Sequence, residues 1–199
     1  MKTAINRRSM LQQITAMAVV AGLEPTRFLQ AQTNQTQAQP VYVSAEEGAK
    51  GKIGQMDIQF KLSSEQSSGT AGLAEITIAP GALGALPHYH DHFDELCRVL
   101  EGTVHILTGN TVTKVSAGGW HLRPRGMVHT FWNSGDVPAK TIDICLPGGH
   151  EKYLKELAAL FDKNNRPSSA DFKMLEKKHD IHYRPDLLPG IMKEYKVHL

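Results

Sequence analysis

Three histidines and three carboxylates gather in one short stretch of the chain, PHYHDHFDE, which ends at Glu95. His88 and His90 are separated by one residue, which is the side-chain period of a β-strand, so both imidazoles should project from one face. A turn after His90 would bring Glu95 onto the start of the next antiparallel strand. Two imidazoles and a carboxylate from adjacent strands form a partial coordination sphere for a divalent metal.

A further imidazole, His129, stands later in the chain. Pro124 and Gly126 mark a turn before it, and His129 opens an extended run of aromatic and β-branched residues that ends at Trp132. A strand that starts there can supply one more ligand. The predicted metal ligands are therefore His88, His90, Glu95 and His129.

Two spaced motifs in this region resemble those of the cupin superfamily. The first, H-x-H-x4-E-x6-G, begins at His88, and the second, G-x5-P-x-G-x2-H-x3-N, begins at Gly118. Ala82 stands where the first motif usually begins with Gly, and this departure changes no ligand. The resemblance runs from about Met56 to Leu146 and implies a double-stranded β-helix, which is a jelly-roll barrel.

The resemblance also implies a cofactor and leaves two functions open. A cupin site with these four ligands holds a divalent metal ion such as Fe, Mn, Ni or Zn. The order of elements is similar to small single-domain cupins of the quercetin dioxygenase type, which implies a dioxygenase-like oxidoreductase acting on a small organic substrate. Glu95 would then alternate between metal ligand and catalytic proton acceptor. The alternative is a non-catalytic cupin that binds a metal or a small ligand.

Residues beside the predicted ligands should shape the pocket. Phe131 shares a strand face with His129, and Cys97 shares one with Glu95, so both are expected to line it. His92 is expected in a loop, because a ligand there would leave no room for the turn before Glu95. Cys97 and Cys145 are expected to be buried and unbridged, although export would permit a disulfide. His105 and His121 are expected to be exposed, and Trp120 and Trp132 to pack in the barrel.

The elements that position these residues are short strands with regular turn signals between them. Alternating or β-branched runs predict strands at 56–62, 73–78, 88–90, 95–100, 104–107, 111–115, 120–122, 129–132 and 141–146. No helical pattern interrupts them, which is typical of an antiparallel sandwich or barrel. The predicted fold class is therefore all-β, with the barrel spanning residues 41–149.

The hydrophobic period changes to a helical one after Pro147. Leu154, Leu157, Ala158 and Phe161 form one apolar stripe, and a second helix is predicted from Ser169 to Lys178. Residues 150–199 are therefore predicted to be a C-terminal helical extension, and the cupin resemblance implies that it packs on the outside of the barrel.

The first 31 residues resemble a twin-arginine export signal. Arg7 and Arg8 precede an apolar run that is far shorter than the ~20 residues needed to cross a bilayer. Ala31 ends a small-residue cleavage site, with Ala38 as a second option, and residues 32–40 read as a disordered linker. An amphipathic helix is the alternative for the first segment. The signal predicts a periplasmic or secreted protein whose mature form has no membrane span.

Net charge argues against nucleic acid as a partner. The chain carries +2, and its first 31 residues hold four basic residues against one Glu, a net of +3, so the remainder carries 2 − 3 = −1. Phosphate backbones are bound by an excess of Lys and Arg, which this remainder lacks. A small-molecule substrate or ligand is the expected partner, and a homodimer is left open.

Overall fold

Alternating apolar and polar residues build the longest strands. In the computed structural model, which describes residues 38–164 and 166–199, β2 (Met56–Leu62) and β3 (Gly72–Ile78) bury every second side chain. β2 and β3 pair with each other as antiparallel strands, and β2 also pairs with β1 (Lys50–Ile53). The predicted segment 1–31 and most of the predicted linker lie outside the described residues.

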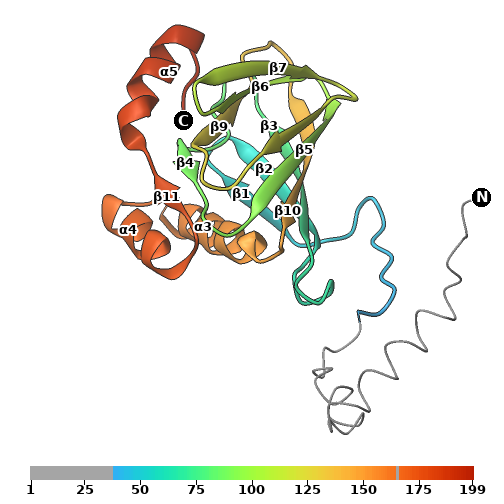
Figure 1. Ribbon diagram of the computed structural model, residues 1–199. Helices are drawn as coiled ribbons and strands as arrows, with labels where there is room; N and C mark the ends of the chain where they lie inside the picture. Colours follow the sequence, from blue (N-terminus) through green and yellow to red (C-terminus); the bar gives the residue numbers. More distant parts are fainter. Residues whose placement is uncertain (1–37, 165) are drawn as a thin grey trace, which may run out of the picture. The chain divides into compact units, whose positions relative to one another are not determined.

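The described strands form two facing sheets (Figure 1). One has the order β1-β2-β3-β10-β5-β8, and the other β11-β4-β9-β6-β7. The remaining strands are β4 (His88–Tyr89), β5 (Asp94–Glu101), β6 (Thr103–Thr108), β7 (Thr111–Ser116), β8 (Trp120–Arg123), β9 (His129–Trp132), β10 (Ala139–Leu146) and β11 (His182–Tyr183). Paired strands run antiparallel throughout these sheets, as the predicted all-β jelly roll requires.

Apolar side chains from both sheets fill the space between them. Ile58, Ile76, Val99 and Ile106 are each at most 2% exposed and belong to one core cluster. Burial of each such side chain contributes roughly 1.5–3 kcal/mol. This core supports the strand ends from which the polar cluster described below projects.

Every predicted strand is present, with bounds that differ by a residue or two. The His strand is the exception in length, because β4 contains only His88 and Tyr89. β1 was not predicted, since its sequence KGKI has a single strongly apolar residue and is recognisable only by its pairing with β2.

The C-terminal segment contains the predicted helices and further elements. It comprises α3 (His150–Asn164), α4 (Ser169–Lys178), β11, the 3₁₀ helix η1 (Pro185–Leu187) and α5 (Leu188–Tyr195). The bounds of α4 are those predicted, and the side chains of Ser168 and Asp171 form a capping box at its start.

This segment packs on the outside of the barrel and also joins it. Leu157, Leu175 and Ile181 form one apolar cluster, while α5 places Ile191 beside Trp132. β11 pairs with β4 and so extends the second sheet past the His strand (Figure 1). None of the helices in the described part of the chain is long and apolar enough to span a membrane.

Candidate metal centre

Three strands bring the predicted ligands together. β4 carries His88 and leads directly to His90, β5 carries Glu95, and β9 begins with His129, which lies opposite His88 in the sheet. The four side chains offer ligand atoms that all lie within 4.8 Å of one another. None of the four residues is more than 5% exposed.

Each imidazole is oriented by a main-chain carbonyl. The Nδ1 atoms of His88, His90 and His129 lie 2.6, 2.6 and 3.0 Å from the carbonyl oxygens of Leu86, Asp180 and Met127. A carbonyl can only accept, so each Nδ1 donates its proton to the carbonyl, and in the neutral imidazole Nε2 then keeps a lone pair that can bind a metal. Outer hydrogen bonds of this kind orient the histidine ligands of protein metal sites.

The lone pairs point at a carboxylate rather than at a donor. His90 Nε2 lies 3.3 Å from Glu95 Oε1, and His129 Nε2 lies 3.4 Å from Glu95 Oε2. Both Nε2 atoms are fully buried and have no hydrogen-bond partner among the described residues. Lone pairs that face a carboxylate repel it unless a cation lies between them, so the cluster suits a divalent metal such as Fe, Mn, Ni or Zn.

Electrostatics keep His88 and Glu95 in the forms that bind metal. Burial and the neighbouring rings of His129 and His90 lower the pKa of His88 well below its ordinary value, so this imidazole stays neutral. Burial opposes the charge on Glu95, but the Arg123 guanidinium, together with contacts from His129 and His90, overcomes this effect and holds the pKa of Glu95 well below its usual range. Neutral imidazole and ionised carboxylate are the forms that coordinate a metal.

Glu95, Arg123 and Asp143 form a buried ion triad that the sequence did not predict. Arg123, which is 1% exposed, places Nη1 3.0 Å from Glu95 Oε2 and Nη2 2.8 Å from Asp143 Oδ2. The register of the sheet creates this contact, because Glu95 lies opposite Arg123 on β8. The sequence did not reveal this role, because Trp120 was expected to pack in the barrel, whereas Trp120 and Leu122 face outward and leave Arg123 on the inner face.

His150 is a second residue that the sequence did not reveal as part of the site. It begins α3, is 8% exposed, and its Nε2 lies 3.6 Å from Glu95 Oε1. Its ring stacks on that of Tyr153, with centroids 4.9 Å apart. Burial and the nearby His90 lower the pKa of His150 to about 3, so it is a neutral imidazole.

A cavity of about 480 Å³ opens beside the cluster. His88 and Glu95 reach it from the cluster, and most of its remaining wall is apolar. Phe131 lines it, as predicted. Cys145 also lines it, whereas Cys97 lies in the barrel core on the same strand face as Glu95 and does not line it.

The other histidines and tryptophans lie away from the cluster. The His92 side chain is 81% exposed in the β4–β5 loop, where a loop residue was expected. His105 and His121 are half-buried rather than exposed, and His105 stacks on Trp132 with centroids 6.0 Å apart. The prediction that Trp120 packs in the barrel is wrong, since it is 54% exposed with the Arg98 guanidinium 5.3 Å from its ring.

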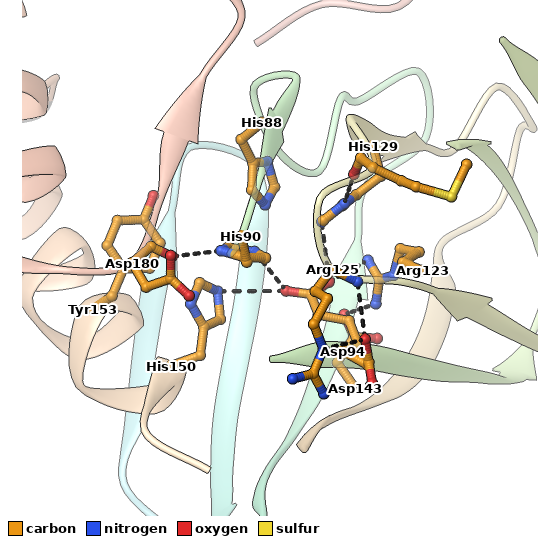
Figure 2. Close-up of polar contacts among 12 residues, drawn as sticks. His88, His90, Asp94, Arg123, Arg125, His129, Asp143, His150, Tyr153 and Asp180 are labelled. Atoms are coloured by element: carbon orange, nitrogen blue, oxygen red, sulfur yellow. Dashed lines mark hydrogen bonds and ion pairs between the residues drawn. The ribbon is translucent and has the colours of Figure 1, made fainter. Parts of the chain in front are cut away.

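Two residues of the second sequence motif, Arg125 and Asn133, have structural roles near the cluster. Arg125 donates from its main-chain nitrogen and its guanidinium to the Asp94 carboxylate, which fixes the turn before His129 (Figure 2). Asn133 is 1% exposed and donates to the carbonyls of Ile78 and Val137. Both cysteines of the chain are free and buried, as expected.

Comparisons with known proteins agree with this geometry. Residues 74–145 match the Cupin domain family. Germin-like protein 5-1 of Oryza sativa subsp. japonica is 37% identical over 95 residues, which are 44% of this chain and 42% of that protein. Nectarin-1 of Nicotiana langsdorffii x Nicotiana sanderae is 39% identical over 75 residues, 35% of this chain and 32% of that protein. The chain therefore spans less than half the length of these curated relatives.

Solved structures share the fold. The structure of a predicted oxalate decarboxylase from Thermotoga maritima superposes on this chain with a TM-score of 0.51 at 19% sequence identity. The superposition covers 54% of this chain and 99% of that protein. Residues 74–145 thus match the cupin domain, and the fold that holds the His/Glu cluster is the cupin jelly roll.

Proposed function

We propose that this chain is an exported, metal-binding cupin that acts as a dioxygenase-like oxidoreductase on a small organic substrate. The observation that carries the proposal is the convergence of three imidazoles and Glu95 in a buried cluster that opens into an apolar cavity. A buried metal with an accessible side is what metal-dependent catalysis requires.

His88, His90, Glu95 and His129 would hold the metal. A bound divalent metal would supply Lewis acidity and a centre at which an oxygen donor of the substrate and dioxygen can meet. Carboxylate and imidazole accept several first-row metals, so Fe, Mn, Ni and Zn all fit this donor set.

The chain's own residues would bind and orient the substrate. Phe131, Leu157 and Phe172 line the cavity and would exclude water from an apolar substrate. His150 and Tyr153 offer polar groups on the side of the cavity nearest Glu95. A substrate oxygen could therefore face the cluster while the body of the substrate packs against aromatic and aliphatic side chains.

The charges around the cavity disfavour a dianion. Glu95, Asp143 and Glu151 all line it, and Arg123 is already paired with the first two of them. Arg166 lies among the lining residues but is exposed. Apart from the charge of the bound metal, a dianion would face carboxylates with little free positive charge, so an uncharged or singly charged substrate with an apolar body fits better.

We assign Glu95 first to metal binding. Its additional role as a proton acceptor is part of the proposal and would require Glu95 to take a proton despite the adjacent Arg123. Substitution of Glu95 by Gln tests this role, because Gln keeps the shape and a ligand oxygen but cannot accept a proton as a carboxylate does.

The test is oxygen consumption by protein loaded with Fe(II) or Mn(II). Flavonols, diketones and oxalate form the substrate panel, and His129→Ala loaded in parallel is the control for free-metal chemistry. Uptake with a flavonol or a diketone, and none with oxalate, is the expected result. A metal-loaded protein that consumes no oxygen with any of them is instead a metal- or ligand-binding cupin.

A further inference from the structure

The C-terminal segment reaches one of the three clustered imidazoles directly. The main-chain oxygen of Asp180 lies 2.6 Å from His90 Nδ1 (Figure 2). The corresponding carbonyls for the other two imidazoles come from Leu86 and Met127, each only two residues from the histidine that it orients. His90 alone of the three depends on a residue 90 positions away.

The side chain of Asp180 holds the same part of the barrel. Its two carboxylate oxygens accept the main-chain N–H groups of Asp91 and His92, at 2.9 and 2.8 Å. These residues form the loop that joins His90 to Glu95. A single residue thus orients one clustered histidine and fixes the connection to the clustered carboxylate.

The neighbouring contacts dock the segment along the same loop. His182 Nε2 lies 2.9 Å from Asp91 Oδ2, and the main-chain N–H of Arg184 donates to the carbonyl of Pro87 at 2.7 Å. β11 pairs with β4 between these two contacts. The docked segment also contributes Tyr183, Leu188 and Leu199 to the cavity wall.

We propose that Asp180 is a positioning residue for the metal centre, and that docking of the C-terminal segment and metal binding are coupled. The proposal rests on the metal binding part of the proposed function and not on catalysis. Outer hydrogen bonds to a ligating histidine fix its tautomer and ring orientation, and their loss costs about 10- to 100-fold in metal affinity. Coupling is reciprocal, so the metal should in turn hold the segment in place.

The first measurement is Co(II) affinity, obtained by competition with a chromophoric chelator. Asp180→Ala removes both carboxylate contacts, and Asp180→Asn keeps the shape but replaces one acceptor oxygen with a donor. Asp180→Ala keeps the main-chain carbonyl that faces His90 but loses the carboxylate contacts that hold it in place. We therefore expect Co(II) affinity to fall by about 10-fold in Asp180→Ala, the lower end of the range for loss of an outer hydrogen bond, and by less in Asp180→Asn. Asp186→Ala is the matched control, because Asp186 is an exposed carboxylate of the same segment that pairs with its neighbour Arg184.

The second measurement separates positioning from simple support of the fold. Amide hydrogen exchange of residues 91, 92 and 181–184 is followed with and without Co(II). Bound Co(II) should slow this exchange in the wild type and do so much less in Asp180→Ala. A merely structural role would lower the thermal midpoint of the metal-free protein but leave both the affinity of the folded protein and the effect of Co(II) on exchange unchanged.

The outcomes distinguish this proposal from the proposed function. If folded Asp180→Ala binds Co(II) with the affinity of the wild type, the positioning role is overturned, whatever the protein catalyses. A wild-type protein that binds no Co(II) overturns both proposals. If Co(II) binding and docking of the C-terminal segment are coupled but no oxygen is consumed, the positioning role is supported and only the proposed oxidoreductase activity is overturned.

Discussion

At the scale of single residues, the cluster owes its chemistry to three Nε2 atoms that carry lone pairs. His90→Ala and His129→Ala each remove one of them and should abolish stoichiometric metal binding, while the barrel still folds because its apolar core does not depend on the metal. Metal content of purified protein and far-UV circular dichroism check this prediction. His92→Ala is the matched control, since its exposed ring lies outside the cluster. Full metal content in either ligand variant would refute the assignment.

The buried guanidinium of Arg123 should contribute most to folding stability when no metal is present. Arg123→Met leaves the carboxylates of Glu95 and Asp143 without their cation, and an unpaired buried charge costs about 3–5 kcal/mol of folding free energy. Urea unfolding of the metal-free variant should show this loss, and a bound divalent cation should restore part of it by supplying positive charge beside Glu95. Arg125→Met, which breaks an exposed pair, should cost at most about 1 kcal/mol. Equal effects of the two substitutions would contradict the prediction.

Residue spacing predicted the four clustered side chains but not the groups that surround them. The strand period places His88 and His90 on one face, an expected turn brings Glu95 to them, and the resemblance to the two cupin motifs adds His129. Arg123 meets Glu95 through the register of two strands, which a single strand's pattern cannot specify. Asp180 acts through its main-chain oxygen, and no side-chain pattern reports on that atom.

At the scale of elements, periodicity predicted strands and helices well where their apolar residues are regular. α4 has its predicted bounds because a capping box marks its start. β11 and α5 were missed, since β11 is two residues long and exists only by pairing with β4, and the Pro and Gly near the start of α5 disfavour a helix by propensity. Packing of Ile191 against the barrel outweighs that propensity.

The start of α3 is tied to the β2–β3 loop by Glu151. Its buried carboxylate accepts the main-chain N–H groups of Ser64 and Gly149, at 2.7 and 2.8 Å. Burial opposes the charge, but the contacts with Ser64 lower the pKa of Glu151 below its ordinary value of 4.5. Glu151→Gln keeps one acceptor and loses the charge, so unfolding at pH 7 should become easier by about 1–3 kcal/mol.

The pH dependence of this loss follows from the direction of the pKa shift. A lowered native pKa means that the carboxylate stabilises the fold fully above pH 4.5 and loses this contribution as the pH falls through the native pKa. The difference between wild type and Glu151→Gln in urea unfolding should therefore shrink below pH 4.5. Asp57→Asn, which disturbs only an exposed pair with Lys52, is the control and should stay close to the wild type. A difference that grows on acidification would refute the role given to Glu151.

At the scale of the whole molecule, barrel and C-terminal segment act together around one cavity. The barrel supplies the clustered ligands, and the segment supplies His150, the Asp180 contacts and part of the cavity wall. Motif spacing predicted the barrel as the seat of chemistry, and the cupin resemblance implied that the segment packs on its outside. The segment's contribution could not be predicted, because it depends on contacts between residues far apart in the chain.

Export is the last prediction and concerns how this whole molecule acquires its metal. We propose that the N-terminal Arg7-Arg8 segment directs twin-arginine export, a route that carries folded proteins, so that the metal is bound in the cytoplasm. A His/Glu site assembled after export would instead favour Cu(II) or Zn(II) by the Irving–Williams order. Replacing both arginines with lysine should leave an unprocessed, longer form in the cytoplasm, detected by fractionation and intact mass. A single Lys2→Arg substitution, outside the arginine pair, serves as the control. If the double variant is exported and cleaved normally, the segment is an ordinary secretory signal, and Zn(II) becomes the expected occupant of the site.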